Sequence, residues 1–287
     1  MNQKKIKILL ELTKFKISLF SSLTVSVGYI LATGSLTLET FIPTFGILFL
    51  ACGSSALNHY QERNTDKLMK RTKGRPIPSG RIAAGKVLTV SIILCFLGLL
   101  ILFLGTNQTA FLLGLFALMW YNGVYTNLKK VTAFAVVPGS LIGSIPPAIG
   151  WSAGGESLAD PQIWPVLFFF FIWQIPHFWL LILLYGEQYE NAGLPSMTKL
   201  FSVRQIKRLI FIWIIATAVT CTLFPFFGLV KFSIINIALY GLAIWLIFKS
   251  SRMFGVNADN YSPGSGFRVI NIYALLVIML ISIDNLI

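Results

Sequence analysis

Residues 41–76 read FIPTFGILFLACGSSALNHYQERNTDKLMKRTKGRP, an apolar run that ends in a cluster of acidic, amide and basic side chains. The run from 41 to 60 carries no Asp, Glu, Lys or Arg. Its length matches the ~20 residues that a helix needs to cross the hydrocarbon core of a bilayer. This stretch therefore predicts a membrane-spanning helix that delivers a polar cluster to the membrane surface.

Similar apolar runs recur along the 287 residues, which are 56% hydrophobic and 11% charged. Soluble domains carry about 25% charged residues, so a soluble protein with a large core is disfavoured. We predict an all-α, polytopic membrane protein, a single domain over 1–287 with about nine helices packed around a central cavity. The predicted spans are 17–33, 41–60, 84–104, 110–126, 133–151, 163–185, 208–229, 232–248 and 269–286.

The distribution of Lys and Arg predicts how these spans are oriented. With nine spans, every basic residue except Lys231 falls on one side of the membrane. Short loops rich in Lys and Arg stay in the cytoplasm. We therefore expect a multi-pass protein of a bacterial-type inner membrane, with its N-terminus and basic loops in the cytoplasm and its C-terminus outside. Topology explains the net charge of +13, so no nucleic-acid partner is predicted.

The polar cluster after the second span has the composition of a metal site. If the helix continues, Asn58, Glu62 and Asp66 lie at i, i+4 and i+8 on one face, each step rising ~6 Å. Mg²⁺ prefers oxygen ligands and typically joins one or two carboxylates to substrate phosphates. We predict that these three residues hold a metal ion and are catalytic.

Basic residues follow at once, namely Lys67, Lys70, Arg71, Lys73 and Arg75. Arginine pairs bidentately with phosphate oxygens and lysine acts as a point charge. One short stretch thus combines carboxylates that can hold a metal ion with basic side chains that can hold phosphate. This combination suits a reaction with a diphosphate leaving group. A solvated loop on anionic lipid also explains the basic residues, but not the four-residue spacing of the oxygen-bearing side chains.

A second cluster lies at the turn between the fourth and fifth spans, also on the predicted cytoplasmic side. Tyr125, Lys129 and Lys130 are placed to reach the same phosphates. By itself this signal is weak, because any cytoplasmic turn can hold a Lys-Lys pair.

The sixth predicted span contains a histidine next to a proline, His177 after Pro176. An ionisable residue inside a membrane is a functional hypothesis by default. His177 is a candidate proton acceptor, axial iron ligand or hydrogen-bond donor to substrate; the alternative is a histidine that bonds the kinked helix. At the cytoplasmic end, Glu187, Tyr189 and Asn191 form a candidate second metal shelf, or plain surface charge at a helix end.

These motifs resemble those of the intramembrane aromatic prenyltransferases related to 4-hydroxybenzoate polyprenyltransferase, and more closely the protoheme IX farnesyltransferases. The family's NxxxDxDxDxxMxRTxxRP motif is matched at Asn58, Asp66, Met69, Arg71, Thr72, Arg75 and Pro76. Its LTKPR, YTxxLKRxT, PPxxGW, WQxPHF and DYxxAGxP motifs are similar to residues 12–16, 125–132, 146–151, 173–178 and 188–195. The resemblance covers most of the chain.

The sequence departs from the family at Phe15 and Lys16, which replace the Pro and Arg of LTKPR, and at four further positions. Glu62 and Asn64 replace the first two Asp residues of the main motif, Gln188 replaces the Asp before Tyr189, and Ala135 replaces an Asn. Fewer carboxylates leave the number of Mg²⁺ ions open.

The resemblance implies transfer of a farnesyl group from farnesyl diphosphate to the 2-vinyl group of heme b, giving heme O for terminal oxidases. It implies Mg²⁺ as cofactor and, as the residues that hold the diphosphate, Lys67, Arg71, Arg75, Tyr125, Lys129 and Lys130. We expect the protein to lie in the lipid bilayer, because the isoprenoid tail and the porphyrin both prefer lipid to water. Contact with a later heme-modifying enzyme or oxidase assembly factors is left open.

Three alternative functions remain open. A related prenyltransferase would use an aromatic or quinone-precursor acceptor. A secondary transporter would place polar residues near the midplane, whereas here the carboxylates crowd one surface. A non-catalytic heme chaperone would tolerate loss of Glu62 and Asp66.

Overall fold

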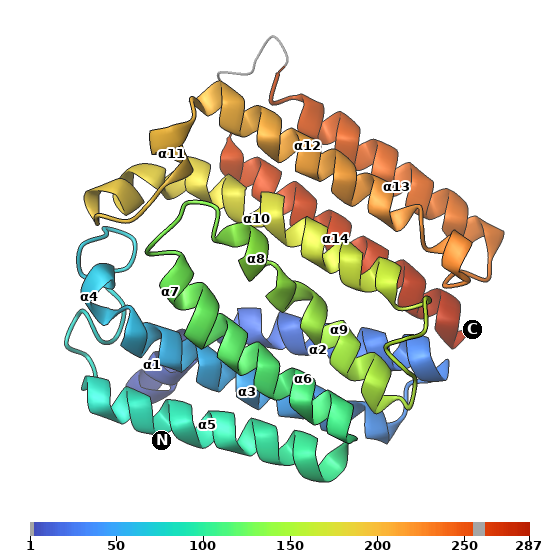
Figure 1. The fold of residues 1–287 in the computed structure, drawn as a ribbon, viewed down its shortest axis with the longest axis horizontal. Helices are drawn as coiled ribbons and strands as arrows, with labels where there is room; N and C mark the ends of the chain where they lie inside the picture. The colour runs from blue at the N-terminus through green and yellow to red at the C-terminus, as the bar shows by residue number, and fades with distance from the viewer. Residues whose placement is uncertain (1–2, 255–261) are drawn as a thin grey trace.

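The computed structural model describes residues 3–254 and 262–287, and all regular structure in these residues is helical. The longer helices form an all-α bundle, as the hydropathy pattern predicts (Figure 1). Their bounds are α1 Gln3–Leu12, α2 Phe15–Thr33, α3 Phe41–Gln61, α5 Ala84–Gly105, α6 Gln108–Leu118, α9 Leu141–Ala153, α10 Trp164–Asn191, α12 Val203–Cys221, α13 Ser233–Ser251 and α14 Pro263–Leu286.

Short helical segments connect them or extend them. Four are single turns of α-helix, two are 3₁₀ turns and one is a π-helix. They are α4 Arg63–Asp66, α7 Thr126–Leu128, α8 Val136–Gly139, α11 Met197–Leu200, η1 Leu38–Thr40, η3 Pro225–Phe227 and the π-helix η2 Met119–Tyr125.

Six helices in the described part of the chain are long and apolar enough to cross a bilayer. They are Phe15–Thr33, Leu38–Gln61, Ala84–Gly105, Trp164–Asn191, Ser233–Ser251 and Pro263–Leu286. Each overlaps a predicted span. The chain is thus a multi-pass membrane protein, while the total of nine spans and a cavity at the bundle's centre stay predictions.

The other three predicted spans correspond to shorter consecutive helices or, for α12, to a helix with several basic residues. The span 110–126 follows α6, η2 and α7, and the span 133–151 follows α8 and α9, which meet at Ser140. The span 208–229 is misplaced, because α12 begins at Val203 and ends at Cys221. The Ser202–Gln205 capping box starts this helix early, and turns follow its end.

The helices pack in two adjoining groups. In one, α3 packs on α5, and α2 packs on both α3 and α9. In the other, α10 packs on α12 and α14, which both pack on α13 (Figure 1). Helix α9 joins the groups through its contacts with α2 and α10.

Glycine allows α2 and α9 to approach backbone to backbone. A Cβ at Gly28 would lie 2.0 Å from the carbonyl oxygen of Pro147, and one at Gly150 would lie 1.9 Å from that of Val25. Lipid offers no hydrophobic drive between helices, so small residues that permit close packing stabilise such contacts. The PPxxGW segment, Pro146–Trp151, therefore has a packing role.

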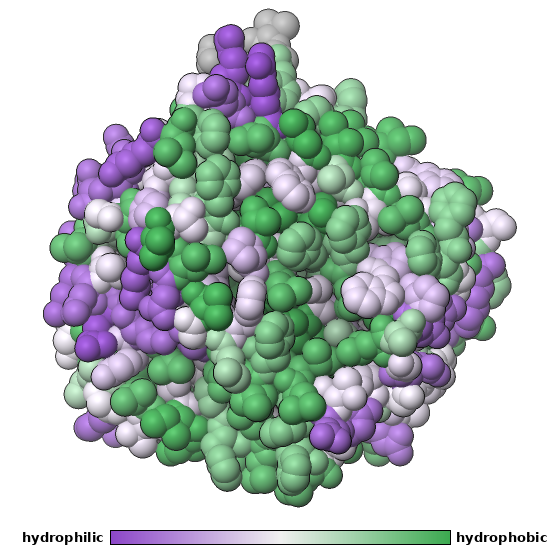
Figure 2. Space-filling view, viewed as in Figure 1, coloured by the Kyte–Doolittle hydropathy of each residue, from purple (hydrophilic) through white to green (hydrophobic). Residues whose placement is uncertain are grey.

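Polar segments gather at one end of the bundle. In Figure 1, α4, α7 and α11 lie at the left end, and the C-terminus lies at the right. Figure 2 shows hydrophilic side chains over that left end, others at the top and the lower right, and a mainly hydrophobic surface between them. The fold thus brings together three of the loops that the sequence predicts to be cytoplasmic.

Candidate active site

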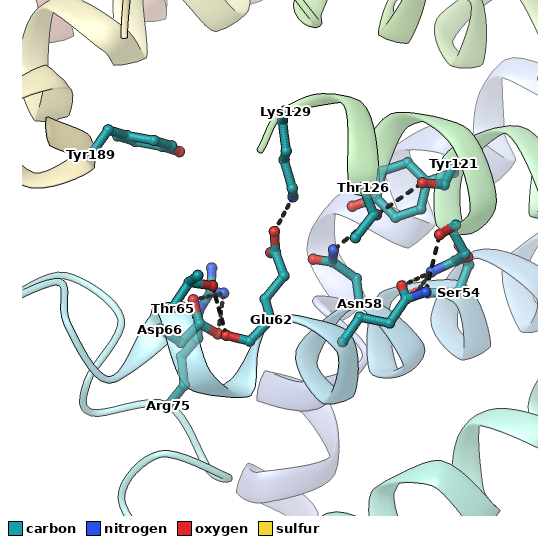
Figure 3. Close-up of polar contacts among 12 residues, drawn as sticks. Ser54, Asn58, Glu62, Thr65, Asp66, Arg75, Tyr121, Thr126, Lys129 and Tyr189 are labelled. Carbon is teal, nitrogen blue, oxygen red and sulfur yellow. Dashed lines mark hydrogen bonds and ion pairs between the residues drawn. The ribbon is translucent and has the colours of Figure 1, made fainter. Parts of the chain in front are cut away.

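The predicted metal ligands lie at the end of α3, where the helix bends but its hydrogen bonding continues. The backbone N–H of Glu62 donates to the carbonyl of Asn58 at 2.9 Å, and that of Asp66 donates to Glu62 at 2.8 Å. Glu62 leaves helical geometry, with φ −96° and ψ 4°, so Asp66 belongs to the separate turn α4. Asn58 and Asp66 are both 1% exposed, and all three side chains are shown in Figure 3.

Both carboxylates are paired with basic side chains. Nη1 of Arg75 donates to both oxygens of Asp66, at 2.9 and 2.8 Å, in a contact formed within the same loop. Glu62 forms an ion pair with Lys129, which reaches it from the turn after α7 (Figure 3). The two sequence motifs therefore meet in space, as predicted.

Asn58 also contacts a basic side chain. Lys14 Nζ donates to Asn58 Oδ1 at 3.2 Å, and Asn58 Nδ2 donates to Thr126 Oγ1 at 3.3 Å. These contacts join the α1–α2 junction, α3 and α7 at one point. Lys14 was not among the predicted site residues, although it belongs to the LTK stretch that resembles the family.

Burial and charge shift the pKa values of this cluster. Burial raises the pKa of Asp66 despite the lowering effect of Arg75. Burial also acts to raise the pKa of Glu62, but Lys129, Lys14 and Arg75 outweigh it and the net shift is downward. Burial, reinforced by Arg75, lowers the pKa of Lys14 to about 7. The cluster is therefore strongly coupled electrostatically.

The π-helix η2 braces the site against α3. Asn122 Nδ2 donates to the Ser54 carbonyl at 3.1 Å and to Gln61 Oε1 at 3.0 Å, and its Oδ1 accepts from Ser54 Oγ at 2.6 Å. Gln61 Nε2 in turn donates to the Asn122 carbonyl at 3.0 Å. Single π-helical turns are frequent at functional sites. This buried network fixes the position of Tyr125, the last residue of η2, and of Lys129 beyond it.

The cytoplasmic end of α10 contacts the basic loop from the other side. Gln188 Oε1 accepts from the backbone N–H of Arg71 at 2.9 Å, and Arg71 Nη2 donates to Tyr189 at 3.4 Å. The guanidinium of Arg71 also lies 5.0 Å from the ring centre of Tyr185. Figure 3 shows Tyr189 on the opposite side of the site from Glu62 and Lys129.

The remaining predicted residues lie at the rim. The side chains of Lys67 and Lys130 are exposed, as are those of Glu187 and Asn191 from the candidate second metal shelf. Of this shelf, Tyr189 is the residue that contacts the basic loop. The structure thus brings Glu62, Asp66 and their basic partners together, while the second shelf stays a prediction.

His177 lies deeper, between α10 and α14. Its Nδ1 is 2.8 Å from Oδ1 of Asn271. Its ring packs on Phe267 and Trp173, with ring centres 4.5 and 4.8 Å away. Asn271 was not predicted, because nothing near it in the sequence suggests a site.

Aromatic rings connect this histidine with the polar cluster. Tyr125 lies 6.4 Å from Phe178, and Phe178 lies 5.4 Å from His177, measured between ring centres. At the other end of the row, Lys129 Nζ is 5.3 Å from the centre of the Tyr125 ring. The row leads from the charged end of the bundle toward its interior.

The donors at the end of α3 fit a hard cation better than a soft one. In the described residues, no group of three His, Cys, Asp or Glu side chains is arranged to hold a metal. Two carboxylates and an amide oxygen remain, and Mg²⁺ is bound in this manner when a substrate phosphate and water complete its shell.

A membrane-embedded helical bundle that carries paired acidic and basic motifs at one surface is typical of intramembrane transferases. The chain belongs to the UbiA prenyltransferase family, which matches residues 21–262. Among its curated relatives are protoheme IX farnesyltransferases. That of Oleidesulfovibrio alaskensis is 30% identical, with 96% of each chain covered. That of Geobacter sulfurreducens is 34% identical over 77% of this chain and 81% of the relative.

A solved structure supports the fold independently. The UbiA homolog from Archaeoglobus fulgidus bound to GPP and Mg²⁺ has a TM-score of 0.74 to this chain. The two share 18% identity, and the match covers 97% of this chain and 99% of the homolog.

Proposed function

We propose that this protein transfers a farnesyl group from farnesyl diphosphate to the 2-vinyl group of heme b, giving heme O for terminal oxidases. The observation that carries the proposal is the meeting of Glu62 with Lys129 and Asp66 with Arg75 at the end of α3. Its acceptor rests on likeness to protoheme IX farnesyltransferases over 96% of the chain.

Asn58, Glu62 and Asp66 are the proposed ligands of Mg²⁺. When bound, Mg²⁺ neutralises charge on the diphosphate as it leaves, which lowers the barrier to ionisation. Asn58 and Asp66 are buried, and the lower dielectric around buried groups strengthens this effect. The Archaeoglobus fulgidus homolog with the same fold is bound to GPP and Mg²⁺, which supports the choice of Mg²⁺ as the metal.

The basic residues are the proposed diphosphate ligands. Arg75 and Lys129 contact the carboxylates, and Arg71 contacts the end of α10. Tyr125, Lys67 and Lys130 complete this set of side chains. Their positive charges stabilise the leaving diphosphate, and arginine does so with a forked geometry that fits phosphate oxygens.

The row of rings from Tyr125 to His177 is the proposed path toward the acceptor. Ring faces stabilise the allylic cation that forms when the C–O bond to diphosphate breaks. The new C–C bond joins farnesyl C1 to the terminal vinyl carbon of heme, and a water oxygen adds to the other vinyl carbon. His177 accepts the proton that this water releases, or contacts the heme iron.

We also propose a location for the reaction. The site lies at the end of the bundle where α4, α7 and α11 gather (Figure 1). Because this end carries the basic loops, it faces the cytoplasm, with the N-terminus inside and the C-terminus outside a bacterial inner membrane.

The test is a transfer assay of purified protein with heme b, farnesyl diphosphate and Mg²⁺, read by mass spectrometry of the heme. We expect a heme whose mass has grown by a farnesyl group and one water-derived hydroxyl. Replacing heme b by 4-hydroxybenzoate tests the quinone-precursor alternative, and we expect no prenylated product. An unchanged heme mass would refute the assignment.

A double variant separates enzyme from heme chaperone. Glu62→Gln with Asp66→Asn is expected to abolish transfer while heme binding, followed by absorption, persists. The matched control is Glu156→Gln with Asp160→Asn, which removes two carboxylates between α9 and α10, away from the site. This control is expected to transfer normally.

A further inference from the structure

In this structure, each proposed metal ligand is matched to a basic side chain. Glu62 is paired with Lys129, and Asp66 with Arg75. The third ligand, Asn58, is neutral, yet its Oδ1 accepts a hydrogen bond from Lys14. The first two pairings join opposite charges, whereas the Lys14 contact places an ammonium on an amide oxygen. Its geometry therefore needs a separate explanation.

The chain holds Lys14 in an unusual backbone conformation. Its φ of 44° and ψ of 47° are left-handed, and it is the only residue other than glycine with positive φ in the described part of the chain. A residue with a side chain adopts this region at a cost, and such outliers cluster at functional sites. The flanking turns are closed by backbone bonds from Ile17 and Ser18 to the Lys14 carbonyl, at 2.8 and 3.1 Å.

This turn points the side chain of Lys14 in a different direction from those of Phe15 and Lys16. Phe15 and Lys16 are exposed, whereas Lys14 is half-buried and aimed at the end of α3. The ammonium also interacts electrostatically with Arg75, Glu62, Lys129 and Asp66. Lys14 therefore lies inside the same charge cluster as the two ion pairs.

We propose that Lys14 is a further substrate-binding residue, one that lies on Asn58 in the metal-free site and moves to the diphosphate when metal and substrate bind. The inference rests on the proposed function. A divalent ion on Asn58 Oδ1 repels an ammonium on the same oxygen, so metal and Lys14 compete for Asn58. The diphosphate offers the displaced ammonium an anionic partner. Lys14 thus weakens metal binding in the empty site and strengthens diphosphate binding in the loaded one.

Lys14→Met tests this by two affinities that must change in opposite directions. The first is the affinity for Mn²⁺, as a paramagnetic substitute for Mg²⁺, titrated by EPR without substrate. The second is the affinity for inorganic pyrophosphate at saturating Mn²⁺. We expect Mn²⁺ to bind about threefold more tightly, and pyrophosphate about tenfold more weakly, the loss typical of one charge-assisted hydrogen bond.

Two variants serve as controls. Lys16→Met removes an exposed lysine two residues away and is expected to leave both affinities unchanged. Lys14→Arg keeps the charge and is expected to stay within about twofold of the wild-type affinities. If Lys14→Met weakens both affinities, or leaves either unchanged, the inference is overturned. Wild-type protein that binds neither Mn²⁺ nor pyrophosphate would instead refute the proposed function, and this inference with it.

Discussion

Nδ1 of His177 on α10 and Oδ1 of Asn271 on α14 lie 2.8 Å apart, 94 residues distant in sequence. An amide oxygen only accepts hydrogen bonds, so this contact places the proton of a neutral imidazole on Nδ1. Nε2 is then the nitrogen with a free lone pair. In the proposed mechanism, Asn271 therefore sets which nitrogen of His177 can accept a proton or contact heme iron.

This relationship predicts graded effects at the two positions. His177→Ala should lower kcat for farnesyl transfer by about 100-fold, the scale of a lost general base. Asn271→Ala should lower it by about tenfold, as for residues that orient a functional histidine. Both are measured by the heme mass assay at several heme concentrations. Equal activity of Asn271→Ala and wild type, with His177→Ala impaired, would show that orientation by Asn271 is irrelevant.

The Arg75–Asp66 pair predicts an effect on stability that differs from the effect on catalysis. Asp66 is 1% exposed, so Arg75→Met leaves a buried carboxylate without its cation. Loss of one partner of a buried pair costs about 3 kcal/mol. Asp66→Asn combined with Arg75→Met should recover much of that loss in thermal unfolding, because no unpaired charge remains. Both variants should be inactive.

A double variant that is no more stable than Arg75→Met would contradict this account. It would mean that the guanidinium stabilises the loop through contacts other than its ion pair with Asp66. Lys73→Met is a suitable control, since Lys73 is an exposed residue of the same loop.

Because the backbones of α2 and α9 are in contact, we predict that a methyl group at Gly150 lowers the stability of the protein. Its Cβ would lie 1.9 Å from the Val25 carbonyl oxygen, so the two helices must separate. Overpacking of this kind typically costs about 1–3 kcal/mol. Thermal unfolding of Gly150→Ala in detergent should show the loss. Gly241→Ala, where a Cβ meets open space on α13, should be neutral or stabilising.

The helices could be predicted from sequence because a helix that crosses lipid needs a long apolar run. The predicted spans at α3, α5 and α14 overlap helices long and apolar enough to cross a bilayer. The end of α12 could not be predicted from sequence, because it depends on the turns that follow Cys221. The role of Asp284 could not be predicted from the sequence either. In the structure it is fully buried and accepts from the backbone N–H groups of Lys231 and Phe232 at 2.6 and 3.1 Å.

The site was predictable where its motifs are local. Asn58, Glu62 and Asp66 keep their i+4 hydrogen bonds, so their spacing predicted their proximity. The contacts that Lys14 and Asn122 make with α3 were not predicted. The left-handed turn at Lys14 and the π-helix that positions Asn122 depend on packing between helices rather than on residue pattern.

The central claim is that the end of α3 holds a divalent ion against an isoprenoid diphosphate. The direct measurement is the ³¹P hyperfine coupling to Mn²⁺ in purified protein loaded with farnesyl thiodiphosphate, a slow-reacting analogue. We predict a coupling that shows phosphate oxygen bound to the metal, and its disappearance in Glu62→Gln with Asp66→Asn. A coupling that persists unchanged in this variant would place the metal elsewhere and contradict the account.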